Sequence, residues 1–541
     1  MAVRSAVMIV GLATLPLGAS LASAETVAFP VVDAAVQVTN NARTVRGHAG
    51  PALAVHPDDE NIVALAEAEA RTGRCGFHIS NDSGLTWTEE ASPQPEDWPR
   101  CTWANYGRVV DISFAEDGTL YYGLTGMKEG ENVPAKVFSA YSDDLGRSFE
   151  TVMPPGLEPE LADNNVGAHG EPTVRADPNN PDRVYMAWQT NWGLWNLGED
   201  QLPQPGRSEL RPFRSRPLLA VSDDGGRTFA EPVKFAGDAG DHLNETDLIV
   251  GNDGELFAFL GESAGPDEEG AKTGPGAGLW FIASQDGGKT FESKAIHTLP
   301  QSEAEGDGEP FSWLGRPVAS IDRQSGDLYV VWENGGGDTL SVQFMRSTDD
   351  GETWSEPMQV NDVEHPRDNL YNELYPTVNV APNGRIDVAW YDWRNDPSYS
   401  DDASKGGVQD IYYRYSTDGG RTWAQSMKIN DRAIDRSFGV FGTQDVNGPV
   451  GLVARDEVTY VAWDDTRNGS PETETSDIYF TRVRFDEPAK VFGVSGDGGS
   501  PRLWALAGLA GGLALAGLAL FLGVPFARRR KVGLEATPSL Q

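Results

Sequence analysis

Cysteine is nearly absent from this sequence, because Cys75 and Cys101 are the only two among 541 residues. Two thiols without neighbouring histidines make neither a zinc site nor a catalytic pair, and the seven histidines are scattered without zinc-ligand spacing. If the chain is exported, the two cysteines can instead form a local disulfide. The sequence also lacks the phosphate-binding glycine loop of P-loop nucleotide-binding enzymes and the serine elbow of α/β-hydrolases.

Positive charge is scarce as well. The chain has 43 lysines and arginines against 81 aspartates and glutamates, a formal net charge of −38, and only ten of the basic residues are lysine. Such a surface repels nucleic acid and anionic lipid, so we expect no nucleic-acid partner. An acid-rich, lysine-poor surface suits either a salty habitat or simple solubility.

Two uninterrupted apolar segments lie near the ends of the chain. Residues 1–24 carry Arg4, an apolar stretch and the small residues Ala22-Ser23-Ala24, the pattern of a signal peptide cut before Glu25. Residues 503–526 are uncharged and, as a helix, are about 36 Å long, enough to cross a bilayer. A basic cluster follows, which predicts a cytoplasmic tail at 527–541, a linker at 491–502 and residues 25–490 outside the cell membrane. A buried core helix and a sorting signal that is later removed are the alternatives.

An eight-residue phrase is abundant instead. It reads "SNDSGLTW", "SDDLGRSF", "SDDGGRTF", "SQDGGKTF", "STDDGETW" and "STDGGRTW". The aspartate is expected to accept hydrogen bonds from amides two residues on, the glycine to take a positive φ, and the final aromatic to start the next strand. Each copy therefore predicts a tight hairpin. The six aspartates are Asp82, Asp144, Asp224, Asp286, Asp349 and Asp418.

The spacing of the phrase indicates repeating units. Successive aspartates lie 62, 80, 62, 63 and 69 residues apart, about enough for four strands with their loops. A strand pair precedes each phrase, and a seventh such pair, "GPVGLVARDEVTYVAWDD" from Gly448, has no phrase after it. Residues 33–40, "DAAVQVTN", resemble the missing outer strand. We therefore predict an all-β propeller of seven four-stranded blades, with the ring closed by an N-terminal strand, and six blades as the alternative.

The phrase resembles the Asp-box of the sialidase or BNR-repeat superfamily, S-x-D-x-G-x-T-W, and the resemblance covers nearly all of residues 30–490. It implies that each box joins the third and fourth strands of a blade on the face opposite the active site and is not catalytic. A sialidase would need three arginines, a tyrosine activated by a glutamate, and an aspartate acid/base.

The sequence departs from this family pattern. The arginine-Ile-Pro signature of the first blade is missing from "RGHAGPALAV". The most similar dipeptide in the sequence is Arg316-Pro317. A nucleophile pair could be drawn from "YNELYP", which holds Tyr371, Glu373 and Tyr375, although strand packing also explains these tyrosines. The catalytic residues are therefore left unassigned, and the chain is expected to be a divergent member.

Candidate binding residues lie on the face opposite the boxes. Two late blades read "AWYDWRN" and "AWDDTRN" at the end of their second strand, where each aspartate and arginine can either pin its own loop or offer a guanidinium to an acidic ligand. Two tryptophans in the long insertion of the third unit can stack on sugars or anchor their loop. The candidate rim is Arg316, Asp392, Arg394, Asp465, Arg467, Trp192 and Trp195.

The sequence predicts no cofactor, although the acidic loops 306–310 and 361–369 could take Ca²⁺ without having EF-hand spacing. Two functions remain open. The first is a membrane-anchored module that binds an acidic glycan or a surface protein. The second is an exo-sialidase-type glycoside hydrolase that acts on acidic glycans.

Overall fold

The computed structural model describes residues 30–41, 43–101, 110–128, 135–157, 168–192, 214–235, 243–262, 278–298, 313–335, 341–362, 373–396, 407–439 and 448–485. Within these ranges every regular element is a β-strand, and no helix long and apolar enough to cross a membrane occurs. The predicted signal peptide and the predicted span at 503–526 lie outside the described residues.

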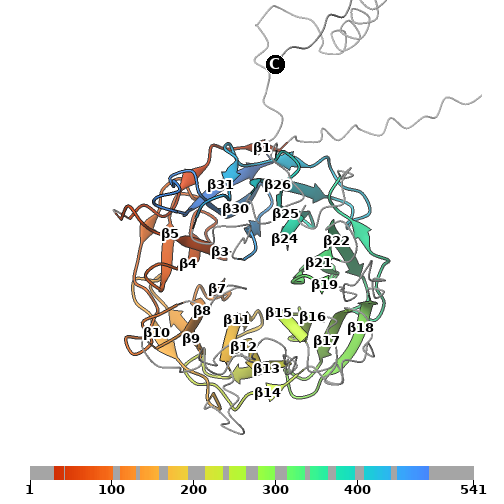
Figure 1. Cartoon of the computed structure of the whole chain (residues 1–541). Coiled ribbons are helices and arrows are strands. Elements are labelled where there is room, and N and C mark those ends of the chain that lie inside the picture. The colour runs from red at the N-terminus through yellow and green to blue at the C-terminus, as the bar shows by residue number, and fades with distance from the viewer. Residues whose placement is uncertain are drawn as a thin grey trace, which may run out of the picture. The chain divides into compact units, whose positions relative to one another are not determined.

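The described strands form seven antiparallel sheets arranged as blades around a centre (Figure 1). The innermost strands of successive blades contact one another, and β29 of the last blade contacts β3 of the first, so the ring is closed. From the centre outwards, blade 1 consists of β3 (His48–Val55), β4 (Val63–Glu69), β5 (Arg74–Ser80) and β6 (Thr88–Glu89), and blade 2 of β7 (Val110–Phe114), β8 (Leu120–Gly126), β9 (Lys136–Ser142) and β10 (Glu150–Val152). Blade 3 consists of β11 (Ala168–Asp177), β12 (Asn180–Trp192), β13 (Arg214–Ser222) and β14 (Val233–Lys234). Blade 4 consists of β15 (Leu243–Val250), β16 (Leu256–Glu262), β17 (Gly278–Ser284) and β18 (Glu292–Thr298).

The remaining blades follow the same order. Blade 5 consists of β19 (Trp313–Leu314) and β20 (Val318–Ile321) at the centre, then β21 (Leu328–Gly335), β22 (Ser341–Ser347) and β23 (Met358–Gln359). Blade 6 consists of β24 (Glu373–Val380), β25 (Ile386–Asp392), β26 (Val408–Ser416) and β27 (Met427–Lys428), and the short β28 (Ile434–Asp435) also pairs with β26. Blade 7 contains β29 (Gly451–Ala454), β30 (Val458–Asp465) and β31 (Asp477–Arg484). The prediction of seven four-stranded blades is confirmed.

The N-terminal strand completes blade 7. Two short pieces, β1 (Val31–Val32) and β2 (Val36–Gln37), pair antiparallel with β31, with Val31 opposite Arg484 and Val36 opposite Phe480. The carboxylate of Asp33 holds Arg482 and Arg484 at 2.6 and 3.0 Å. The predicted closure of the ring is confirmed, with pairing that begins two residues before the expected 33–40 segment.

The Asp-boxes are the hairpins between the third and fourth strands. In all six, the aspartate Oδ1 accepts the amide four residues on, at 2.8 to 2.9 Å, and the Thr or Ser hydroxyl at that position donates to Oδ2 at 2.6 to 2.7 Å. The expectation of a bond to the amide two residues on is wrong. In the last box that amide, of Gly420, donates to Ser416 instead at 3.0 Å, so the Asp418 carboxylate reaches further along the turn.

The box glycine also fixes how neighbouring blades pack. Gly146 has a φ of 81°, and a Cβ there would lie 1.9 Å from the ring of Phe77 on the preceding blade. Gly420 has a φ of 74°, with Phe344 of the preceding blade at 2.4 Å. Both the turn and the blade contact therefore require glycine.

Apolar side chains fill the spaces between blades. Each cluster draws on two neighbouring sheets, as where Phe77 of blade 1 packs with Tyr122 of blade 2. A fully buried tryptophan stands at the same place in the second strand of four blades, namely Trp188, Trp332, Trp390 and Trp463. These contacts make the ring a rigid frame for the loops at its two faces.

Candidate functional site

The innermost strands share an interruption near their beginnings. In blades 1, 3 and 6 the pairing with the second strand skips residues there, and in blade 5 the same break separates β19 from β20. Each break holds a residue followed by proline, as does the start of the innermost strand in blade 7. The five pairs are Gly50-Pro51, Glu171-Pro172, Arg316-Pro317, Tyr375-Pro376 and Gly448-Pro449.

Three of these five positions carry a functional side chain, Glu171, Arg316 and Tyr375, which we call the mouth residues. Glu171 has a φ of 56° and Tyr375 a φ of 52°, a conformation that costs free energy for any residue other than glycine. Gly50, at the equivalent place in blade 1, has a φ of 63°. Glu171 and Tyr375 adopt a positive φ that glycine adopts at lower cost. Their presence at these positions points to a functional role for the two side chains.

The mouth residues come from blades 3, 5 and 6, whose innermost strands β11, β19 and β24 surround the centre of the ring (Figure 1). They lie near the strand starts, on the face opposite the Asp-boxes. An arginine, a tyrosine and a glutamate at the same end of the innermost strands can bind hydroxyl and carboxylate groups of a sugar.

Glu333 of β21 supports two of the mouth positions. Its side chain is fully buried, and its Oε2 accepts the backbone amide of Tyr375 at 2.9 Å. A Cβ on Gly315, which precedes Arg316, would lie 1.9 Å from Glu333 Cγ. Glu333 therefore joins the breaks of blades 5 and 6, and Arg316 itself is only 3% exposed.

Sequence reasoning singled out Arg316 and Tyr375 but missed Glu171 and Glu333. Alignment of the repeats on the proline at the start of the innermost strand would have found Glu171, because "HGEP", "LGRP" and "ELYP" place Glu, Arg and Tyr in one column. Glu333 has no such signal, since it reads as an ordinary strand residue.

A second arginine of an innermost strand, Arg175, is held between carboxylates. Arg175 of β11 pairs with Asp111 of β7 and lies 3.6 Å from Asp247 of β15. The two aspartates also accept backbone amides of the next blade, Val174 at 3.0 Å and Ala319 at 2.9 Å. This network ties blades 2 to 5 together, so Arg175 serves the frame.

The predicted rim pair of blade 6 is closed on itself. Arg394 donates through its amide and Nε to Asp392 at 2.8 and 2.9 Å, and its Nη2 lies 2.6 Å from the same carboxylate. The guanidinium stacks over Tyr412 at 3.8 Å and reaches Asp362 at 3.3 Å, which follows the outer strand of blade 5. These contacts match the interpretation in which the pair pins its own loop.

Blade 7 repeats the arrangement. Arg467 Nη2 lies 2.8 Å from Asp465, its Nη1 lies 2.8 Å from Asp431, and its guanidinium stacks over Tyr479 at 4.0 Å. The side chains of Arg394 and Arg467 are only 11% and 10% exposed. A ligand-binding role for these two arginines stays a prediction.

The other predicted residues divide into two groups. Cys75 and Cys101 are joined in a disulfide with a Cα separation of 5.2 Å. The side chains of Trp192 and Glu373, and all of Trp195, Tyr371 and the loop at 306–310, lie outside what the structure describes, as does most of the loop at 361–369. Among the described residues no group of three or more histidine, cysteine, aspartate or glutamate side chains is arranged to hold a metal ion.

Residues 414–425 match the family described as BNR/Asp-box repeat. The chain is a seven-bladed β-propeller that carries a BNR/Asp-box repeat. The search of curated proteins found no match to this sequence. Among solved structures, the propeller is similar to a protein of unknown function from Dyadobacter fermentans, with 13% identity, 84% of this chain and 99% of that chain covered, and a TM-score of 0.45.

Two sialidases are also similar to the propeller. The Hadza microbial sialidase Hz136 has 16% identity, with 79% of this chain and 74% of that chain covered and a TM-score of 0.41. The phage phi92 endosialidase has 10% identity, with 87% and 71% covered and a TM-score of 0.46. Likenesses this distant carry no functional argument for the chain.

Proposed function

We propose that this propeller binds an acidic glycan at the mouth residues and does not hydrolyse it. The observation that carries the proposal is the set of mouth residues, Glu171, Arg316 and Tyr375, which occupy equivalent breaks in three innermost strands. Arg316 is the group suited to a sugar carboxylate or sulfate, and the other two are suited to hydroxyls.

The pairing of three further described arginines favours binding over hydrolysis. A sialidase-type site needs three guanidinium groups at one carboxylate, yet Arg175, Arg394 and Arg467 are each held by aspartates. The developing charge and the substrate carboxylate of such a transition state depend on guanidinium groups that are free to reach them. A surface protein that presents carboxylates is the other partner with suitable chemistry.

One contact favours the second candidate, a sialidase-type hydrolase. Glu333 accepts the backbone amide of Tyr375 at 2.9 Å and lies against Gly315, the residue before Arg316, so a glutamate links the backbone positions of a tyrosine and an arginine. In that case Tyr375 would be the nucleophile and Arg316 one of the carboxylate ligands.

The proposal includes a location. The apolar pattern of residues 1–24 and 503–526 supports an exported propeller that is anchored by a single C-terminal span, with the mouth open to the outside. Glycans of neighbouring cells or of the surrounding matrix are accessible to such a module.

A glycan array tests the binding proposal. Soluble protein that ends at residue 490 should be retained by sialylated, uronic-acid or sulfated glycans, and retention should weaken as salt screens the guanidinium. Arg316→Gln should lower retention at least about tenfold, which corresponds to the loss of one charge-assisted contact. Arg147→Gln, an exposed arginine in the second Asp-box, is the matched control and should bind as wild type does. Retention that is equal in both variants would contradict a site at the mouth.

A further inference from the structure

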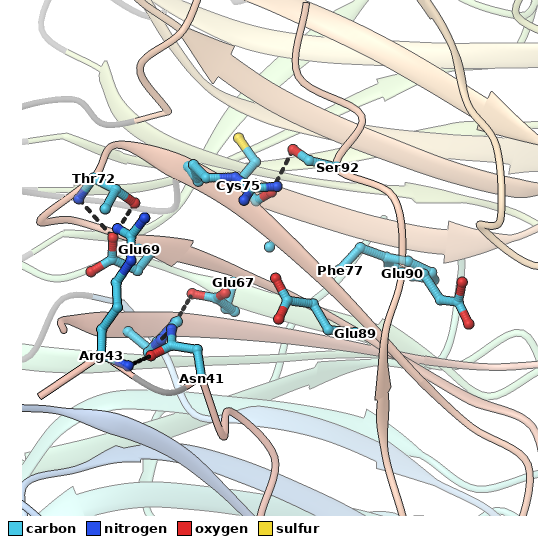
Figure 2. A pocket seen from close by; sticks show the side chains of 13 residues that line it. Asn41, Arg43, Glu67, Glu69, Thr72, Cys75, Phe77, Glu89, Glu90 and Ser92 are labelled. Carbon is cyan, nitrogen blue, oxygen red and sulfur yellow. Dashed lines mark hydrogen bonds and ion pairs between the residues drawn. The ribbon is translucent and has the colours of Figure 1, made fainter.

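A pocket of about 220 Å³ lies in blade 1, away from the mouth residues, and the proposed function does not use it. Strands β4, β5 and β6 contribute to its lining. Asn41 and Arg43, from the connection that leads from the ring-closing strand to β3, contribute as well (Figure 2). The connection that follows the ring-closing strand therefore forms part of the pocket wall.

Two glutamates of β4 form one wall, and both are satisfied within the protein. Glu67 is 1% exposed and lies 2.9 Å from His48 Nδ1 and 3.5 Å from His78 Nε2. Glu69 accepts the amides of Gly47 and Thr72 at 2.8 and 2.6 Å. This wall is thus a fixed polar surface whose charges already have partners.

Gly76 keeps the pocket open behind Glu67. A Cβ at that position would lie 1.8 Å from Glu67 Oε1, so any larger residue would displace the carboxylate. The buried histidine and glutamate pair and the bare glycine together make a built, polar surface.

The two side chains at the flanks of the pocket carry opposite charges. Figure 2 shows Arg43 on one side, and Glu89 on the other with its carboxylate turned toward Glu67, whereas the carboxylate of Glu90 points away. Glu89 lies opposite His78 in the pairing of β5 with β6, which places it on the pocket side of the sheet. Within the described part of the chain, no ion pair or hydrogen bond engages the guanidinium of Arg43 or the carboxylate of Glu89.

The lining favours a charged ligand over a neutral sugar. Two aromatic rings among the described residues line the pocket, those of His48 and Phe77. His48 is buried and paired with Glu67, and the ring of Phe77 packs on Phe149 and Tyr122, with centroids 5.3 and 6.5 Å away. A sugar ring would find no aromatic face there, while a guanidinium and a carboxylate across a small polar pocket suit an anion and a cation on one molecule.

We propose that this pocket binds a small zwitterion, of which a free α-amino acid is the simplest, with its carboxylate at Arg43 and its ammonium at Glu89. Asn41 and Thr72 supply further polar contacts at the same wall. The pocket is separate from the glycan site, so the two proposals stand or fall independently.

Thermal shift and titration calorimetry on the protein that ends at residue 490 test this site, with each of the twenty common α-amino acids as the probe. At least one should raise the melting temperature and give a saturable heat. Propionate carries only the carboxylate and ethylamine only the ammonium. Each should therefore bind at least about tenfold more weakly than the amino acid that binds best.

Variants separate the pocket from other sites. Arg43→Gln and Glu89→Gln should each weaken the binding at least about tenfold, while Glu90→Gln, whose carboxylate points away, should keep it. Comparable melting temperatures of the free variants would show that they fold. Absence of binding by all twenty amino acids, equal binding of propionate or ethylamine, or binding that survives in both flank variants would overturn the proposal.

Discussion

Single aspartates hold the Asp-box hairpins, and the box of blade 6 shows how. Asp418 accepts the amides of Arg421 and Thr422, each at 2.9 Å, and the hydroxyls of Ser416 and Thr422 at 2.9 and 2.7 Å. One carboxylate therefore satisfies four donors of a turn that has two residues at positive φ, Gly419 and Gly420.

Replacing Asp418 by alanine should consequently cost about 1 to 3 kcal/mol of stability, because two amides lose their acceptor. Chemical denaturation of wild type and Asp418→Ala measures this loss, and glycan retention by the folded variant should be unchanged. A variant that melts like wild type but has lost its ligand would refute the structural role of the box.

The group formed by His48, Glu67 and His78 makes stability depend on pH. Burial disfavours the charged form of His48, but the nearby carboxylate of Glu67, helped by Glu69 and Asp477, outweighs this and raises the pKa of His48. Burial also opposes ionisation of Glu67, yet His48 and His78 lower the pKa of Glu67 to about 2. Glu89 faces His78 from β6, and the amide of Asn41 lies 2.9 Å from His48 Nε2.

The two shifts act in opposite pH ranges. Because the folded state raises the pKa of His48, its contribution is complete below the ordinary value of 6.5 and is lost as pH rises through the raised value. The contribution of Glu67 is present above its ordinary value of 4.5 and is lost as pH falls toward about 2.

We therefore expect the melting temperature to fall from about pH 6 to about pH 8, and the fall to be smaller in His48→Gln. His56→Gln, an exchange of a histidine outside the group, is the control and should keep the slope of wild type. Parallel melting profiles for wild type and His48→Gln would exclude a role of this group.

At the scale of elements, the ring closes through a strand from the other end of the chain. Strands β1 and β2 cover the outer edge of β31, and an uncovered edge pairs readily with other chains. Removing residues 25–40 should lower the melting temperature and produce oligomers, which light scattering would detect. Asp33→Ala removes only the ion pairs with Arg482 and Arg484 and should stay monomeric. A monomeric, equally stable deletion variant would show that this strand is dispensable.

The contact between blades gives another prediction. Gly146→Ala forces a methyl group into Phe77 at a φ of 81°, whereas Gly254→Ala has a similar φ of 87° but a nearest neighbour at 3.3 Å. The first should destabilise the fold by about 1 to 3 kcal/mol more than the second, since overpacking adds to backbone strain. Equal losses in the two variants would mean that the ring of Phe77 gives way.

Much of the element plan could be predicted from the sequence. Six similar turn sequences and a seventh strand pair predict the number of blades, and residues 33–40 are recognisable because they resemble other outer strands. The mouth residues are harder to recognise, because what Glu171, Arg316 and Tyr375 share is a backbone break and not a residue type. The partners of Arg394 and Arg467 across the blade boundary, Asp362 and Asp431, lie 32 and 36 residues away and become visible only in the fold.

At the scale of the whole molecule, the proposed glycan site places one arginine, Arg316, in an acidic propeller. The chain has a net charge of −38, so an acidic ligand must be attracted locally, at Arg316, against the charge of the rest of the molecule. Among the described residues, Arg175, Arg394 and Arg467 are each held by aspartates. This pairing favours the proposal that the molecule holds a glycan over the alternative that it cleaves one.

Saturation-transfer NMR on the protein that ends at residue 490, mixed with sialyllactose, tests this claim most directly, because one spectrum series reports both binding and cleavage. The account predicts transfer from protein to the sialic acid protons, loss of that transfer in Arg316→Gln, and a signal of the intact glycoside that stays constant with time. Steady release of free sialic acid that Arg316→Gln abolishes would contradict the account and make the propeller a sialidase.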